Sequence, residues 1–136
     1  MYKKILVPMA LDHDISGTTL AVAKTLTGGD GDITALHVHE EAPATARATL
    51  DDDLLNTAFQ RATEEMRRKT EHLEGVTAKL VTGHTYRTII DYAVENGVDC
   101  IVMGSHKPGL SDYLLGSTAA RVVRHAPCAV HVVRED

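Results

Sequence analysis

Residues 98–134, VDCIVMGSHKPGLSDYLLGSTAARVVRHAPCAVHVVR, decide the fold of this chain. The apolar run near their start stops at Gly104, as a strand in the middle of a parallel sheet does. A later helix must end before Pro127, because the residue that precedes a proline avoids helical geometry. The stretch therefore predicts a buried strand over 99–103, a loop, a helix over 119–125 and a second buried strand over 128–133.

The predicted helix is preceded by a glycine and two hydroxyl residues, Gly116, Ser117 and Thr118. Free backbone N–H groups and a favourable dipole at a helix start suit an anion such as phosphate, and a glycine leaves room for it. Glycine and serine are equally common at helix starts that bind nothing, where Ser117 would simply cap the helix. The local sequence leaves both interpretations open.

Strands and helices alternate along the rest of the chain. We expect strands over 3–8, 33–39 and 77–82, and helices that end at Gly28, Gly75 and Gly97. Together with residues 98–134 this makes four strand–helix repeats and a fifth strand. Such alternation predicts one α/β domain over residues 1–136, with a doubly wound parallel sheet and helices on both faces.

Two features of the middle of the chain lead to more specific expectations. The helix that follows three aspartates at 51–53 has an inward apolar stripe of Leu55, Phe59, Ala62, Met66 and Leu73. Residues 40–50 have little pattern, and we expect them to form a mobile surface segment over the sheet edge or a ligand crevice.

The composition is that of a soluble globular protein and excludes several classes of function. Hydrophobic residues make up 43% and charged residues 24% of the 136 residues. A net charge of −5, no tryptophan and few aromatic residues argue against a nucleic-acid surface. No apolar run approaches the roughly 20 residues of a membrane span. We expect a cytoplasmic protein in which Cys100 and Cys128 are reduced, small core residues.

The glycines and hydroxyls of residues 98–134 resemble the C-terminal signature of the universal stress protein family, G-x2-G-x9-G-[ST]. The opening KKILVPMALDHD, residues 3–14, and LHV at 36–38 are similar to the family's first two strands. The ending RVVRHAPCAVHVVR, residues 121–134, is typical of the family, so the resemblance covers essentially the whole chain. It implies strand order 3-2-1-4-5, binding of ATP or AMP with Mg²⁺ as a possible companion, and a homodimer through the last strand (Cys128, Val130 and Val132).

In that strand order, the strands over 3–8 and 99–103 lie on either side of the point where the winding of the sheet reverses. Ligands of such sheets bind outside the carboxyl ends of these strands. The nucleotide-binding residues that the resemblance implies are Pro8, Met9, Ala10, Asp12, Val38, Met103, Gly104, His106, Lys107, Gly116, Ser117 and Thr118. Among them, Val38 and Met103 would line the adenine slot, and the backbone near Met9 would read the edge of the base.

This chain departs from the family pattern at two places. Lys107 replaces the second glycine, and the spacing to Gly116 is one residue shorter. Ala10 stands where the family has an aspartate that contacts adenine or ribose. These departures support an alternative function, a dimeric interaction or scaffold protein that has lost nucleotide binding, whereas the retained Gly116 motif supports binding.

Several polar residues have two interpretations each. Lys107 would neutralise a β- or γ-phosphate or stay solvated, and His106 would donate to a phosphate or do nothing. Asp12 would hold a ribose hydroxyl or a Mg²⁺ ion through water, or lie in the loop without a ligand. His37 and His39 share one strand face, but no third ligand in the sequence completes a zinc site, so we expect no metal site there.

The motifs of fast nucleotide chemistry are absent from the sequence. There is no G-x-G-x-x-G after the first strand, no G-x-x-x-x-G-K-[ST] and no G-x-S-x-G. No residue is identified as a committed base. We therefore expect a regulatory binding module that hydrolyses ATP slowly at most.

Overall fold

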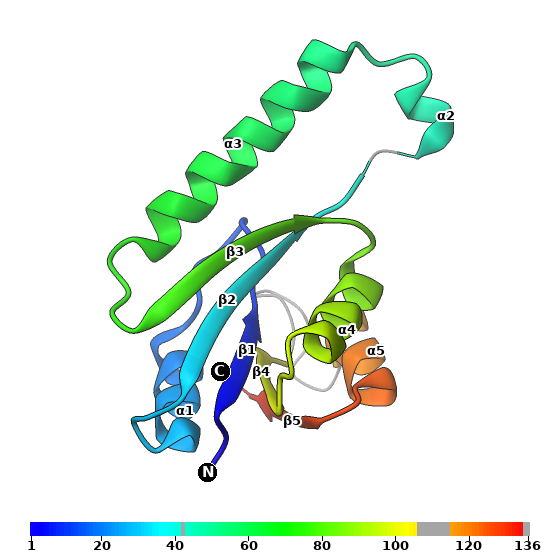
Figure 1. Ribbon diagram of the computed structural model, residues 1–136. Helices are drawn as coiled ribbons and strands as arrows, with labels where there is room; N and C mark the ends of the chain where they lie inside the picture. Colours follow the sequence, from blue (N-terminus) through cyan, green and yellow to red (C-terminus); the bar gives the residue numbers. More distant parts are fainter. Residues whose placement is uncertain (42, 106–114, 135–136) are drawn as a thin grey trace.

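The computed structural model describes residues 1–41, 43–105 and 115–134, so His106 and Lys107 lie outside the described residues (Figure 1). The elements in chain order are β1 (Lys4–Pro8), α1 (Gly17–Thr27), β2 (Asp32–His39), α2 (Ala44–Arg47), α3 (Asp52–Thr70), β3 (Val76–Thr82), α4 (Thr85–Glu95), β4 (Cys100–Gly104), α5 (Ser117–His125) and β5 (Ala129–Val133). No described helix is long and apolar enough to cross a membrane.

The five strands form one parallel sheet in the order β3-β2-β1-β4-β5. Strand β1 is hydrogen-bonded on both sides: Ile5 is aligned with Ile33 of β2 and with Cys100 of β4. The chain winds outward from β1 to β3 and then returns to the other side of β1. The predicted α/β class and strand order are confirmed, and the reversal of winding falls between β1 and β4.

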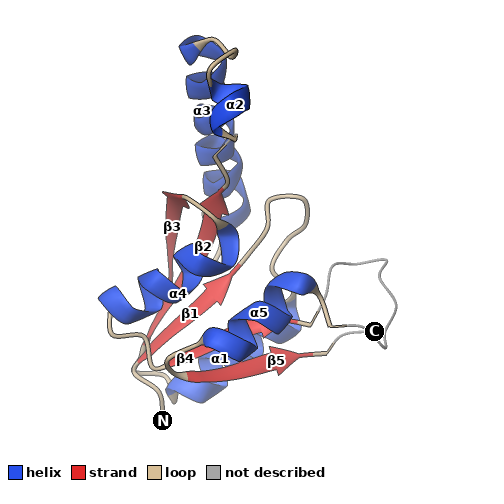
Figure 2. Ribbon diagram, turned by 90° about the vertical axis from the view of Figure 1, so that its right-hand side faces the viewer, coloured by secondary structure: helices blue, strands red, loops and turns tan. Residues whose placement is uncertain are grey.

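Helices cover both faces of the sheet, as predicted. Alternate residues of β1 enter two separate cores, because neighbouring side chains of a strand point to opposite faces. Leu6 joins the core beneath α4 and α5, whereas Ile5 and Val7 join the core that contains Ala23 of α1. Figure 2 shows α4 and α5 in front of the sheet and α1 behind it.

The two cysteines lie on opposite faces of the sheet and do not form a disulfide. Cys100 is fully buried with Ile5 and Val7, whereas the half-buried Cys128 packs on the core of the opposite face. Burial raises the pKa of the Cys100 thiol to about 11 and also raises that of Cys128. Both thiols are free, so the prediction of small core residues is confirmed.

Helix α3 differs from its predicted form. It ends at Thr70, so Leu73 is not part of it, and only the C-terminal part of its stripe, with Ala62 and Met66, is buried. Phe59 remains 40% exposed, its ring meeting His39 edge-on. The reason is geometric, because α3 is longer than the sheet: Figure 1 shows its N-terminal part standing beyond the strands together with α2.

The segment 40–50 contains a secondary-structure element that its sequence did not predict. Residues Ala44–Arg47 form the short helix α2, in which no residue is buried. Figure 1 shows α2 beside the start of α3 and away from the sheet. Helix α2 therefore does not cover a crevice of the sheet. Glu40, the first residue of the segment, lies directly after β2.

Asp99 fastens β1 to β4 at the end of the sheet opposite the switch point. Its two carboxylate oxygens accept hydrogen bonds from the N–H groups of Lys3 and Lys4, at 2.9 and 3.0 Å. Burial works against the charged form, but these two N–H groups outweigh it and hold the pKa of Asp99 below its usual value. The contact aligns the two strands whose far ends frame the crevice.

We expect Asp99→Asn to lower the free energy of unfolding by about 1–2 kcal/mol at pH 7, because charge-assisted hydrogen bonds are lost. A folded-state pKa below the unfolded value of about 3.9 stabilises the protein above that value and stops doing so as the pH falls through the folded value. The difference between the two proteins should therefore shrink below pH 4. Urea unfolding at pH 7, 5 and 3.5 measures it, with Asp91→Asn, an exposed site on α4, as control. A constant difference at all three pH values would contradict this account.

Candidate functional site

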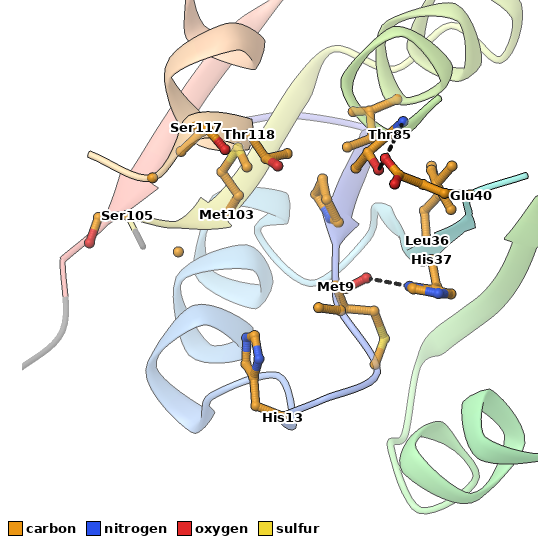
Figure 3. Close-up of a pocket in the computed structure, with 17 residues that line it drawn as sticks. Met9, His13, Leu36, His37, Glu40, Thr85, Met103, Ser105, Ser117 and Thr118 are labelled. Atoms are coloured by element: carbon orange, nitrogen blue, oxygen red, sulfur yellow. Dashed lines mark hydrogen bonds between the residues drawn. The ribbon is translucent and has the colours of Figure 1, made fainter. Parts of the chain in front are cut away.

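A cavity of about 580 Å³ opens at the carboxyl ends of β1 and β4, where the winding reverses (Figure 3). Nine of the twelve residues proposed from the sequence line it: Pro8, Met9, Ala10, Val38, Met103, Gly104, Gly116, Ser117 and Thr118. Asp12 is not among the lining residues, and its carboxylate instead contacts His13. The topology thus brings the ends of β1, β2 and β4 and the start of α5 to one place.

Helix α5 begins at this cavity without a side-chain cap. Its N-cap residue is Gly116, and the first intrahelical bond runs from the Ala120 N–H to the Gly116 carbonyl, at 2.9 Å. The N–H groups of the three residues between them cannot be bonded inside the helix. Ser117, Thr118 and Ala119 all line the cavity, so their side of the helix start faces it. Ser117 is the first helical residue, and its interpretation as the cap is wrong.

Two other helices of the same chain show what α5 lacks. At α1 the Ser16 hydroxyl accepts the Thr19 N–H, and at α3 the Asp51 carboxylate accepts the Asp53 N–H. Such caps satisfy donors that are otherwise left over at a helix start. In α5 no described side chain caps the helix start, so these donors can bind an anion, which the helix dipole also favours.

The glycines at the cavity are not required by the backbone. Neither Gly104 nor Gly116 has a positive φ, and a Cβ added to Gly104 would find no atom within 4 Å. Neither backbone strain nor packing against the described residues thus accounts for glycine at position 104. The space in front of Gly104 is part of the cavity.

Part of the cavity wall is apolar, and hydrogen bonds of the Met9 backbone lie beside it. Val38 and Met103 are buried in its wall. The Met9 N–H donates to the Leu36 carbonyl at 2.9 Å, and the Met9 carbonyl accepts from His37 Nδ1 at 3.0 Å. The N–H of Met9 is therefore already used, and only the second lone pair of its carbonyl is left for the edge of a base.

Sequence reasoning missed five polar residues that line this cavity: His13, His37, Glu40, Thr85 and Ser105. The Thr85 hydroxyl donates to the Glu40 carboxylate, and this hydrogen bond lowers the pKa of Glu40. Figure 3 shows this pair on the side away from Ser117. Sequence spacing does not reveal this pair, because Glu40 follows β2 and Thr85 follows β3, and only the pairing of these two strands brings their ends side by side.

The comparisons with known proteins agree with this architecture. The sequence model described as "Universal stress protein family" matches residues 1–134. The chain belongs to the universal stress protein family. It is 31% identical over 144 residues to a universal stress protein of Methanothermobacter thermautotrophicus, covering 98% of this chain and 97% of the relative. It is also 30% identical over 145 residues to universal stress protein G of Escherichia coli O157:H7, covering 98% and 100%.

Solved universal stress proteins share the fold. The protein UspA from Lactobacillus plantarum superimposes with a TM-score of 0.74 at 27% identity, over 98% of both chains. More distant structures include one from Arabidopsis thaliana with AMP bound, at 18% identity and a TM-score of 0.63, over 98% of this chain and 92% of that one. Another, in complex with cAMP, has 21% identity and a TM-score of 0.61, over 99% and 98%. At these low identities, the two comparisons show that the fold is shared.

The uncapped helix leads to a prediction about stability. We expect Gly116→Asp to raise the free energy of unfolding by about 0.5 kcal/mol, because a carboxylate at the N-cap accepts free N–H groups and suits the dipole. Thermal unfolding of both proteins measures the gain. Gly116→Asn is the matched control, since it offers the same shape without the charge. A loss of stability in both variants would show that the start of α5 is not an open donor site.

Proposed function

We propose that this universal stress protein binds an adenine nucleotide, ATP or AMP, in the cavity at the switch point and acts as a regulatory module in the cytoplasm. The observation that carries the proposal is the uncapped start of α5, which faces a cavity with apolar walls. Free N–H groups suit phosphate, and apolar walls suit a base. Members of the same fold that hold AMP and cAMP add support for the ligand class.

In this proposal the phosphates lie against the N–H groups of Ser117, Thr118 and Ala119, in the space in front of Gly104. The base lies between Val38 and Met103, and Mg²⁺ accompanies ATP through its phosphates. Ala10 lines the cavity and offers no carboxylate to the ribose, so binding relies on the helix start and the apolar walls. A cavity of about 580 Å³ is of the size of small-molecule sites, which supports a bound ligand over the scaffold alternative.

The described lining residues do not include an arrangement suited to fast hydrolysis. His37 is bonded to the Met9 carbonyl, and Glu40 accepts from Thr85. In Figure 3, both pairs lie away from Ser117 and Thr118 at the start of α5. Neither pair is therefore placed to direct a water molecule at a phosphate bound there. We therefore propose binding with slow hydrolysis at most.

The test begins with purified protein that is denatured and analysed for released nucleotide, followed by calorimetric titration with ATP and AMP, with and without Mg²⁺. We expect saturable binding that Gly104→Val weakens at least about tenfold, because the added side chain fills the phosphate space. The stability of that variant should stay within about 0.5 kcal/mol of the wild type, since a Cβ there meets no atom.

Gly17→Val is the matched control for this experiment. Gly17 also has open space where a Cβ would lie, but it begins α1 and does not line the cavity. Its substitution should leave binding unchanged. Wild-type protein that releases no nucleotide and binds none at millimolar concentration would instead favour the scaffold alternative.

We further propose a homodimer through the edge strand β5. Among the described strands, β5 pairs only with β4 and forms one edge of the sheet. An edge strand offers unpaired backbone groups to another chain. Cys128 and Val130 pack on the core of their own chain, and Val132 is half-buried. The exposed side chains that a partner strand would meet are therefore those of Ala129 and His131.

We expect Ala129→Lys with His131→Lys to convert a dimer into a monomer, because two lysines on the edge of one copy face two on the other. Sedimentation velocity measures the change, and circular dichroism checks that the monomer is folded. Lys79→Ala with Thr77→Lys, which redistributes charge on the opposite edge strand β3, is the control. A dimer that survives the β5 double substitution would locate the interface elsewhere.

A further inference from the structure

His13 is a cavity residue to which neither the sequence motifs nor the proposed nucleotide pose assigns a role. It lies in the loop between β1 and α1, and its side chain is 37% exposed. Figure 3 shows its ring pointing into the cavity from below, toward the side where Ser117 and Thr118 lie. Its Nδ1 atom lies 2.8 Å from Oδ1 of Asp12.

The contact with Asp12 decides which nitrogen of the ring can change its proton. A carboxylate has no proton to give at neutral pH, so Nδ1 must be the donor in this hydrogen bond. In the neutral ring, Nε2 is then an acceptor with a lone pair, which repels a phosphate oxygen. Only the protonated ring, with N–H groups at both nitrogens, can donate to an anion in the cavity while keeping its bond to Asp12.

We propose that His13, held by Asp12, takes up a proton when a nucleotide phosphate binds at the start of α5, so that binding tightens as the pH falls. The inference rests on the proposed function, because it requires a phosphate in this cavity. His13 and the residues at the start of α5 line the same cavity. The charge on the ring and the charge on the phosphate therefore attract each other within the cavity.

The charged groups on the loop side of His13 are already partly balanced. Asp12 faces the ring directly, and Asp14 is tied to Lys69 of α3 at 2.9 Å. The hydrogen bond from Lys69 is the largest cause of the lowered pKa of Asp14, with His72 and His13 adding to it. Asp12 is thus the carboxylate that holds the ring.

The groups across the cavity have partners of their own. His37 uses Nδ1 to bond the Met9 carbonyl and has no carboxylate in that contact. Glu40 accepts from the hydroxyl of Thr85, and that bond lowers its pKa, so it stays ionised through neutral pH. Among the described lining residues, His13 alone combines a carboxylate partner with a ring that points toward the helix start.

The sign of the pH effect follows from linkage. If the complex holds more protons than the free protein, the affinity rises as the pH falls through the range in which histidine changes charge, between about pH 5 and 8. We expect the affinity for AMP to be about fivefold higher at pH 6 than at pH 8, beyond the change caused by the phosphate's own protonation. In His13→Gln that excess should vanish.

The experiment is calorimetric titration of the full chain with AMP at pH 6, 7 and 8. Each titration is made in two buffers of different ionisation enthalpy, which gives the number of protons taken up. The AMP phosphate titrates identically with every variant, so the difference between wild type and His13→Gln isolates the ring. His125→Gln is the matched control, an exposed histidine at the end of α5 that does not line the cavity.

The expected result is proton uptake in the wild type and in His125→Gln that is reduced in His13→Gln. Asp12→Asn gives a second measurement that keeps the ring: it should also reduce the uptake, because the ring loses the carboxylate that fixes Nδ1 as the donor, and a neutral ring can then donate from Nε2. AMP binding with equal proton uptake in wild type and both pocket variants would overturn this inference and leave the proposed function standing. A wild type that binds no AMP at any pH would overturn both.

Discussion

The site depends on the pairing of β1 with a strand on each side. Its three central residues, Ile5, Leu6 and Val7, are at most 1% exposed, so β1 has no free edge and no free face. A chain that builds β2 and β3 on one side of β1 must cross over before it can build β4 and β5 on the other. The helices that come next in the chain, α1 after β1 and α5 after β4, therefore lie on opposite faces of the sheet, which leaves a gap with room for a ligand where the winding reverses. Asp99 holds the opposite ends of these two strands together and so aligns the strands that frame the gap.

The chain fills this gap with a helix start that is left open. Helices α1 and α3 use Ser16 and Asp51 to satisfy their first N–H groups, whereas α5 starts at a glycine that has no side chain to do so. A side-chain cap would make α5 more stable, because it would satisfy an N–H group at the helix start. The N-cap residue of α4, His84, also makes no side-chain cap bond, but the Glu40 carboxylate accepts the N–H of Thr85, the first residue of α4, at 3.4 Å. At α5, whose start faces the cavity, the N-cap glycine has no side chain that could compete with a ligand for the first N–H groups.

The sequence predicted the architecture well because strands buried on both faces are continuous apolar runs, and because glycines and prolines end the elements between them. The family resemblance, together with the strand ends and the Gly116 motif, implied nine residues that line the cavity. It also implied Asp12, as a substitute for the family's aspartate at position 10, but the contact of that carboxylate with the ring of His13 cannot be read from spacing. Glu40 and Thr85 are 45 residues apart, and a contact of this kind follows from tertiary structure alone. The length of α3 misled in a similar way, because an amphipathic stripe does not reveal where the sheet beneath it ends.

The arrangement of charge in the cavity sets the direction in which a ligand can lie. The free N–H groups of α5 are at one side, with the ring of His13 pointing toward them, and the carboxylate of Glu40 is at the other. Positive potential at the first side attracts an anion, whereas an ionised carboxylate repels one. A molecule with a phosphate at one end and an uncharged, flat group at the other can therefore enter in one orientation only, with its phosphate at α5. A molecule with anionic groups at both ends would meet Glu40 with one of them. The proposed pose, with the phosphate at the start of α5, therefore agrees with the placement of His13 and Glu40 in the cavity, and it does not depend on the carboxylate that Ala10 replaces.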